Sequence, residues 1–180
     1  MIQKIISSLG YKIRKEYSSS IFLAYKKNTP VIIRAEEDDE QGNTSLRKEK
    51  HVLQLTQGIV GIPAFRWLYE TPKAIVLARE YIPGKLLAQL SKEKGRKKVL
   101  DLQNRQQRSM LEQTLHQAHQ QGITNTDLSE EDVLIAEDGR PYLFDWDCAI
   151  LKKDVSAHEF RKACRTDFED LDRVCKAVGL

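Results

Sequence analysis

The pattern of apolar residues changes character once along this 180-residue chain, at Pro83-Gly84. Before this dipeptide the apolar residues alternate or form short β-prone runs, with one stretch at helical spacing. After it they recur at helical spacing over long segments. Neither Pro nor Gly favours the interior of a helix or strand. The sequence therefore predicts an α+β fold in two parts, residues 1–82 and 83–180, joined at a hinge.

The first part is expected to hold five strands and one helix. Three strands are expected between residues 11 and 36, and two more between residues 63 and 82 around a turn at Thr71-Pro72. A helix between them is expected to start at a capping residue among 43–45 and to end by Gly58. The predicted order is therefore three strands, one helix and two strands.

The second part is expected to be mostly helical. Helices are predicted over residues 85–95, 105–121 and 157–178. Between the last two, an irregular loop over residues 124–132 precedes a hairpin whose turn is Asp138-Gly139. The chemistry-bearing residues of this part are expected in that loop and at the ends of that hairpin, because rigid elements commonly hold functional groups on loops.

Composition excludes several classes of protein. The net charge of +3 is too small for phosphate attraction to dominate, so nothing strongly indicates nucleic-acid binding. No apolar run reaches the ~20 residues of a membrane-spanning helix, and the amino terminus has no secretory pattern. The three cysteines, Cys148, Cys164 and Cys175, lack metal-ligand spacing, and their odd number argues against a disulfide framework. A cytoplasmic protein is expected.

Two charged runs stand out within this mild balance. The acidic run spans Glu36 to Glu40, and the stretch from Lys92 to Lys98 holds five basic residues. Like-charge runs usually form solvated loops or helix ends, and we expect that here. The basic stretch is the one weak indication of an acidic partner or of peripheral contact with lipid head groups.

Three aspartates lie where a helix or strand is expected to give way to a loop. These are Asp127, Asp132 and Asp145. Taken singly, each aspartate is better explained as a turn cap or a strand end than as a functional residue. If the loop and the hairpin converge, the three carboxylates supply the oxygen ligands that Mg²⁺ prefers. A carboxylate-rich protein that binds a cation without a nucleotide is one hypothesis that follows.

Four segments, taken in order, resemble those of the protein-kinase-like superfamily. They are Val31 to Arg34, similar to the V-A-I-K strand; Val76 to Gly84, similar to the adenine-binding hinge; Leu115 to Leu128, similar to the stretch that leads to H-R-D; and Leu143 to Asp147, similar to D-F-G. The resemblance implies a two-lobed fold with a five-stranded antiparallel sheet and one helix in the first lobe. It also implies a reduced, mostly helical second lobe.

The resemblance assigns catalytic and metal-binding roles to the three aspartates. It implies that Asp127 orients and deprotonates the acceptor hydroxyl, and that Asp145 holds Mg²⁺ against the phosphates of ATP. Asp132 falls where the second metal ligand, normally Asn, is found. The implied reaction transfers a phosphoryl group from Mg-ATP to a hydroxyl of a protein or a sugar.

The resemblance also assigns nucleotide-binding residues to the first part. Arg34 takes the place of the phosphate-gripping Lys, and Glu49 that of its helix partner. Lys26, one strand earlier, is an alternative cation or simply a solvated strand residue. Ser19 lies at the centre of the turn where the glycine-rich phosphate loop is expected. The segment expected to hold adenine through backbone groups comprises Glu80, Tyr81 and Ile82.

The chain departs from the kinase pattern at several of these places. Arg replaces Lys at residue 34, serines replace the glycines of the phosphate loop, and Asn125 stands where the His of H-R-D is expected. Only 33 residues follow Asp147, too few for the substrate-binding helices of ordinary protein kinases. The chain is more similar to small atypical branches such as RIO kinases and lipopolysaccharide core-sugar kinases. Two hypotheses follow: an active atypical kinase, or a pseudokinase that acts as a nucleotide- or partner-binding regulatory module.

Overall fold

Contacts divide the chain into two compact units. The computed structural model describes residues 1–37, 45–94, 102–125 and 127–178. The first unit comprises residues 1–54 and 63–81, and the second comprises residues 55–62 and 82–180. The predicted division after residue 82 differs from this one mainly because segment 55–62 belongs to the second unit.

The first unit is built on a five-stranded antiparallel sheet, as predicted. Its strands are β1 (Lys12–Ser18), β2 (Ile21–Lys26), β3 (Thr29–Glu37), β4 (Phe65–Thr71) and β5 (Ala74–Glu80), in the order β1-β2-β3-β5-β4. The helix α2 (Ser45–Leu55) lies between β3 and β4 in the chain, as expected. A short helix α1 (Ile2–Ser8), which the sequence patterns did not predict, precedes the sheet.

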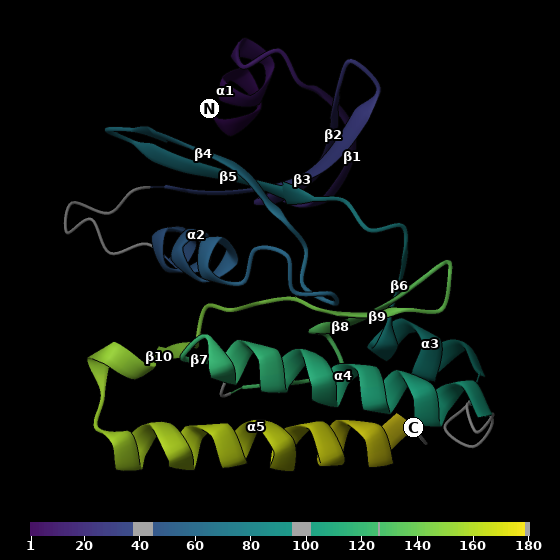
Figure 1. The fold of residues 1–180 in the computed structure, drawn as a ribbon. Coiled ribbons are helices and arrows are strands. Elements are labelled where there is room, and N and C mark those ends of the chain that lie inside the picture. The colour runs from purple at the N-terminus through teal and green to yellow at the C-terminus, as the bar shows by residue number, and fades with distance from the viewer. Residues whose placement is uncertain (38–44, 95–101, 126, 179–180) are drawn as a thin grey trace. The chain divides into compact units, whose positions relative to one another are not determined.

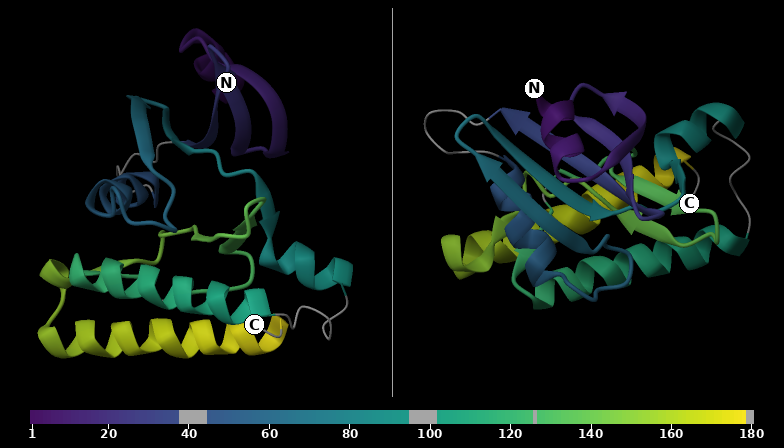
Figure 2. Two further views of the ribbon diagram at one scale, coloured as in Figure 1. Left: turned by 45° about the vertical axis from the view of Figure 1, so that its right-hand side comes forward. Right: turned by 90° about the horizontal axis from the view of Figure 1, so that it is seen from above.

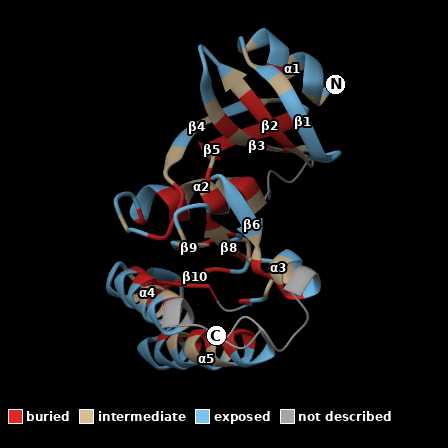
Figure 3. Cartoon of the chain, turned by 90° about the vertical axis from the view of Figure 1, so that its right-hand side faces the viewer, coloured by how far each residue is buried: buried red, intermediate tan, exposed pale blue. Residues whose placement is uncertain are grey.

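The two helices cover opposite faces of this sheet (Figure 1). Side chains alternate between faces along a strand, so β3 presents alternate residues to α1 and to α2. The cluster of buried residues on the α1 face contains Ile6, Phe22, Ala24, Val31, Ile33, Ala35, Val76 and Ala78. On the other side, α2 buries Leu46, Val52 and Leu53. The edge strand β1 is largely exposed, whereas β5 is buried on both faces (Figure 3).

The second unit combines three helices with short strands. Its helices are α3 (Leu87–Lys94), α4 (Leu102–Gln120) and α5 (Ala157–Val178), and a 3-10 turn covers Lys152–Asp154. Its strands are β6 (Gly84–Leu86), β8 (Val133–Ala136) and β9 (Pro141–Leu143) in one sheet, and β7 (Ile123–Thr124) and β10 (Ile150–Leu151) in another. Helices α4 and α5 run side by side in opposite directions (Figures 1 and 2). Among the described residues, no helix has the length and apolarity needed to cross a membrane.

The predicted hairpin and the helix over residues 157–178 are confirmed, and the units divide one residue before Pro83-Gly84, but Gly84 also has a role in a strand that the sequence did not predict. Gly84 opens strand β6 and pairs with Ala136 of β8. A Cβ atom at Gly84 would lie 2.3 Å from the carbonyl oxygen of Ile135, so the strand approaches too closely for any other residue. A glycine that reads as a breaker in the sequence is therefore a close-packing residue in a sheet.

The charged runs are only partly described. Glu36 and Glu37 belong to β3, so the predicted solvated loop does not begin until after them. Residues 38–40 lie outside the described residues. Lys92 lies in α3, and residues 95–98 of the basic stretch also lie outside the described residues.

Segment 55–62 is fixed to the second unit by two of its carbonyl groups. The Thr114 hydroxyl of α4 donates to the carbonyl oxygen of Val60 at 3.0 Å, and the amide of Leu143 donates to that of Gly61 at 2.7 Å. Gly61 has a φ of +93°, and a Cβ there would lie 2.5 Å from the Thr114 hydroxyl. Position 61 therefore requires glycine twice over, for its backbone conformation and for its closeness to α4.

Gly61→Ala is expected to destabilise the protein more than Gly139→Ala. Both glycines have positive φ, but a Cβ at Gly139 meets nothing within 4 Å. The control therefore carries only the left-handed backbone cost of about 1–2 kcal/mol, and Gly61→Ala adds the clash with Thr114. We expect a Tm for Gly61→Ala lower than that of Gly139→Ala by about 3 °C or more in thermal unfolding. Equal Tm values would contradict the contact.

Candidate functional site

In the first unit, Arg34 and Glu49 form the ion pair that the sequence predicted. Arg34 Nη1 donates to Glu49 Oε2 at 2.8 Å, although the two residues lie 15 positions apart. Arg34 is on the face of β3 opposite the α1 cluster, and Glu49 is on α2, where it is fully buried. Arg79 of β5 donates to the second carboxylate oxygen of Glu49 at 2.6 Å. A buried carboxylate is thus shared by two guanidinium groups.

The other proposed cation, Lys26, lies elsewhere. In the β2–β3 ladder Lys26 pairs with Thr29 at the hairpin end, whereas Arg34 pairs with Ile21 at the opposite end. Lys26 Nζ donates to the carbonyl oxygen of Leu9 at 2.9 Å and lies over the ring of Tyr11. Lys26 and Arg34 therefore lie at opposite ends of the β2–β3 ladder. Lys26 instead holds the chain segment that precedes β1.

Ser19 lies in the tight turn between β1 and β2, where the sequence placed it. Its neighbours satisfy one another, since the hydroxyls of Ser18 and Ser20 lie 3.2 Å apart and the amide of Ser20 donates to Ser18 Oγ at 3.3 Å. The amide of Ala35 donates to the carbonyl oxygen of Ser20 at 2.9 Å and so ties the turn to β3. The serine hydroxyls thus form hydrogen bonds within the turn. In the kinase pattern, glycines at this place leave the backbone amides open to phosphate.

The segment expected to hold adenine begins at Glu80, the last residue of β5, and continues beyond the strand. The carboxylate of Glu80 accepts a bond from the amide of Ala64 at 3.1 Å and lies 3.5 Å from Arg66. Tyr81 is the last residue of the first unit. Ile82 begins the second unit, where it is buried against Ala136 and Phe144. Glu80 is therefore structural, because its amide also donates to the carbonyl oxygen of Ala64 at 2.8 Å and it pairs with Val31 of β3.

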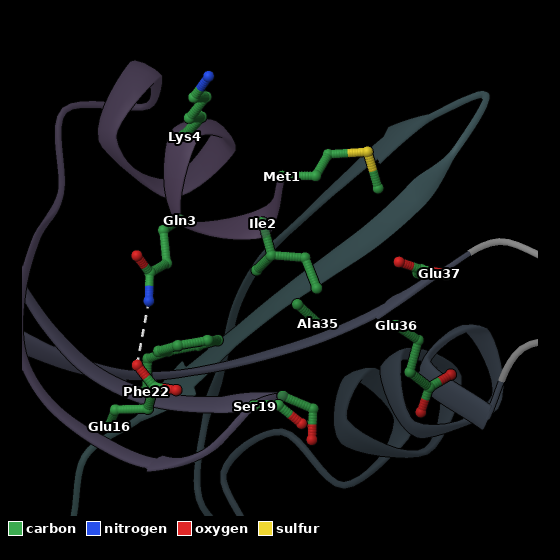
Figure 4. A pocket seen from close by; sticks show the side chains of 11 residues that line it. Met1, Ile2, Gln3, Lys4, Glu16, Ser19, Phe22, Ala35, Glu36 and Glu37 are labelled. Atoms are coloured by element: carbon green, nitrogen blue, oxygen red, sulfur yellow. Dashed lines mark hydrogen bonds between the residues drawn. The ribbon is translucent and has the colours of Figure 1, made fainter.

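A concave surface of about 860 Å³ lies on the α1 side of the sheet. Its floor is apolar and includes Ile2 and Phe22, while Glu16 and Glu37 lie among its lining residues (Figure 4). Arg34 does not line it, because Arg34 faces α2 on the other side of β3. Acidic side chains outnumber basic ones in the lining, with Glu16, Glu36 and Glu37 against Lys4, and this charge is unfavourable for the polyphosphate of a nucleotide.

In the second unit, the loop that carries Asp127 is anchored to a buried carboxylate. Asp167 of α5 is fully buried, accepts a bond from the amide of Asn125 at 3.0 Å and contacts His119 Nε2 of α4 at 2.6 Å. The Asn125 side-chain amide donates to the carbonyl oxygen of Asp145 at 3.4 Å. Asp127, two residues further on, is exposed. These contacts hold the start of the loop while leaving Asp127 accessible.

The β8–β9 hairpin brings Asp132 next to the segment that contains Asp145. Asp132 immediately precedes β8, and its carbonyl oxygen accepts a bond from the amide of Phe144 at 2.8 Å. The Asp132 carboxylate accepts two bonds from Ser129, from its amide at 2.8 Å and from its hydroxyl at 2.6 Å. The register of the hairpin therefore fixes which two carboxylates approach each other.

Asp145 has a backbone conformation that is uncommon for residues other than glycine, although aspartate adopts it more readily than most. Its φ of +52° lies in the left-handed region. Outside the β2–β3 turn at Lys27-Asn28, it is the one non-glycine residue among those described with positive φ. Such conformations cost on the order of 1 kcal/mol and concentrate at functional sites.

The surroundings of Asp132 affect its acid–base behaviour. Burial raises the pKa of the Asp132 carboxyl above its ordinary value, the bonds from Ser129 lower it, and the charges of Asp145 and Asp127 raise it further. Asp132 therefore lies within reach of the charges of both other aspartates. Within the described ranges, however, no group of three or more His, Cys, Asp or Glu side chains is arranged to hold a metal ion. Carboxylate oxygens are ligands that Mg²⁺ prefers, so Asp132 and Asp145 could hold this ion only together with other oxygen ligands.

Two positioning residues were missed by the sequence reasoning. Arg79 is the one charged residue within the otherwise apolar run from Ala74 to Arg79, and a lone charge in a buried strand signals a buried partner. Asp167 occupies the buried stripe of α5 between Phe160 and Leu171, where apolar residues are expected. The sequence thus indicates that Arg79 and Asp167 are buried and charged, but it does not identify the residues that pair with them.

The comparisons with known proteins give no family for this chain. No family model matches it, and no curated protein matches it. The interpretation of the site therefore depends on the contacts described above.

Asp132→Asn is expected to raise the Tm at pH 7 by about 1–3 °C in the presence of a chelator. Because folding raises the pKa of this carboxyl, its ionisation destabilises the folded state as pH rises above the unfolded value of about 3.9. Asparagine removes the charge and retains an acceptor for Ser129. The gain should shrink towards zero as pH falls below the unfolded value of about 3.9, where the carboxyl is protonated in both the folded and the unfolded state.

Asp138→Asn is the matched control, because bonds from Arg140 lower the pKa of Asp138. Folding favours the ionised form of that carboxyl, so this variant should not gain stability at pH 7. A Tm for Asp132→Asn at or below that of wild type at pH 7 would contradict the assignment.

Asp167→Ala is expected to lower the free energy of unfolding by about 3 kcal/mol, because it leaves the Asn125 amide and His119 without their buried acceptor. Glu169→Ala, on an exposed position of the same helix, should change it by no more than about 0.5 kcal/mol. Denaturant unfolding followed by circular dichroism measures both. Similar losses in the two variants would show that Asp167 does not anchor the loop.

Proposed function

We propose that this chain is a small phosphotransferase with a two-lobed, protein-kinase-like fold, which binds Mg-ATP and transfers its terminal phosphoryl group to a hydroxyl of a protein or a sugar. The first unit is the nucleotide-binding lobe in this proposal, and the second supplies the carboxylates. The α+β architecture with one five-stranded antiparallel sheet is compatible with it.

The observation that carries the proposal is the contact between Arg34 and Glu49. A phosphate-binding cation on the third strand, paired with a glutamate of the following helix, is what the resemblance to kinases requires. The two side chains meet at 2.8 Å. Arginine presents five N–H donors in a planar fork, a geometry that suits the binding of phosphate oxygens as well as carboxylates.

The aspartates of the second unit take the remaining roles. Asp127 is exposed in an anchored loop, where it accepts the proton of the acceptor hydroxyl as that oxygen attacks the phosphorus. Asp132 and Asp145 hold the cation that neutralises phosphate charge. Phosphoryl transfer asks a protein mainly for positioning and charge neutralisation, and these residues supply the groups for both.

A second candidate is a pseudokinase that binds a nucleotide or a partner without turnover. The serine turn favours it, since the hydroxyls of Ser18 and Ser20 bond each other and close the loop that would otherwise cradle phosphates. In this candidate Arg34 still binds phosphate, but Asp127 no longer accepts a proton from an acceptor hydroxyl.

Thermal shift with MgATP tests nucleotide binding. At MgATP tenfold above its Kd, we expect the wild-type Tm to rise by about 3–6 °C, because a ligand specific for the folded state stabilises it. Asp145→Ala should lose this shift, and the control Asp154→Asn, at an exposed position, should keep it. No shift at millimolar MgATP would reject both candidates. A shift with Mg²⁺ that ATP does not enlarge would point to a cation-binding protein.

Turnover separates the two candidates. For the phosphotransferase, ATP hydrolysis or autophosphorylation should fall by about 100-fold or more in Asp127→Asn, while the MgATP thermal shift remains. If wild type shows the shift but no turnover above Asp127→Asn, the pseudokinase candidate replaces the first.

A further inference from the structure

Glu49 is held by two arginines that come from neighbouring strands. In the β3–β5 ladder Ile32 pairs with Arg79 and Arg34 pairs with Leu77, so the two arginines are diagonal neighbours on the sheet face that α2 covers. Their side chains are 14% and 10% exposed, and Glu49 is 0% exposed. Each arginine bonds a different carboxylate oxygen, at 2.8 and 2.6 Å.

With two arginines, one can neutralise Glu49 while the other binds an anion. A single arginine would have to do both. A buried carboxylate that loses its only partner leaves an uncompensated charge, which strongly destabilises the fold. If Arg34 were the sole partner, drawing it towards a phosphate would weaken its hold on Glu49 and so on α2. With Arg79 on the other oxygen, Glu49 keeps a buried ion pair whatever Arg34 does.

We propose that Arg79 is a positioning residue, which docks α2 on the sheet through Glu49 and thereby allows Arg34 to engage an anion without releasing the helix. The docking stands on the contacts of the first unit alone. Only the identity of the anion, the phosphates of a nucleotide, rests on the proposed function. Helix α2 consequently stays docked whether or not the site is occupied.

Hydrogen exchange of the α2 amides in the full chain tests the docking without any ligand. Arg34→Met should leave their exchange within about threefold of wild type, because Arg79 still pairs with Glu49. The double variant Arg34→Met/Arg79→Met should raise it by about tenfold or more, well beyond the sum of the single effects. Arg34→Met/Arg79→Lys should retain protection, because lysine supplies a charge to the same oxygen.

Arg47→Met provides the matched control for this measurement. Arg47 also joins α2 to the sheet, through a 3.1 Å pair with Glu70 of β4, but both side chains of that pair are at least one-third exposed. An exposed pair contributes little, so combining Arg47→Met with Arg34→Met should leave α2 protected. The proposal is overturned if Arg34→Met alone raises α2 exchange about tenfold, or if the double variant Arg34→Met/Arg79→Met keeps wild-type protection.

Nucleotide titration then tests the link to Arg34. In Arg79→Met, Arg34 has to serve both Glu49 and phosphate, so the Kd for MgATP should rise about tenfold while that for adenosine stays within about threefold. Arg79→Lys should restore the affinity for MgATP. An unchanged Kd for MgATP in Arg79→Met overturns the positioning role. If wild type binds no MgATP, the proposed function fails, and the exchange measurements decide the docking of α2.

Discussion

A carboxylate taken out of water must be supplied with donors, and this requirement organises both units of the chain. Glu49 and Asp167 are both fully buried, one in each unit. Glu49 draws arginines from two strands to one helix, and Asp167 draws a backbone amide and a histidine from segments far apart in the sequence. Each carboxylate therefore fixes the geometry around it, because losing all of its partners would leave a buried charge uncompensated.

Two of the candidate functional residues, Arg34 and Asp127, lie next to these buried carboxylates in space or along the chain. Arg34 contacts Glu49 directly, and Asp127 lies two residues beyond Asn125, whose amide bonds Asp167. A buried anchor with an exposed neighbour is a favourable arrangement for chemistry, since the neighbour is held in place yet remains open to solvent and ligand. Asp145 differs, because its left-handed backbone shows strain that the surrounding structure maintains.

The sequence predicted most of the fold, because apolar periodicity decides which segments form strands and helices. The strands of the first unit, helices α4 and α5 and the β8–β9 hairpin follow from it. It gave no signal for β6, since Pro83-Gly84 has the composition of a loop and the pairing with β8 is set by distant residues. Helix α1 was missed because its seven residues are too few for a clear period.

The site was predictable where two residues are related by spacing, and less so where contacts depend on packing. The pairing of Arg34 with Glu49 was implied by the resemblance to kinases, and the structure brings the two residues together. Nothing local connects Arg79 to Glu49 or Asp167 to Asn125, since those contacts span 30 and 42 residues and arise only when the elements pack. Lys26 was an alternative that the register of one hairpin removes.

The path of the chain through the two units limits how the protein can be dissected. Segment 55–62 belongs to the second unit but is connected on both sides to the first, so the backbone passes from one unit to the other three times. A fragment that stops at residue 82 would carry this segment away from Thr114 and Leu143, which bond its carbonyl groups. Neither unit is a contiguous stretch of polypeptide. A single proteolytic cut therefore cannot release either unit intact.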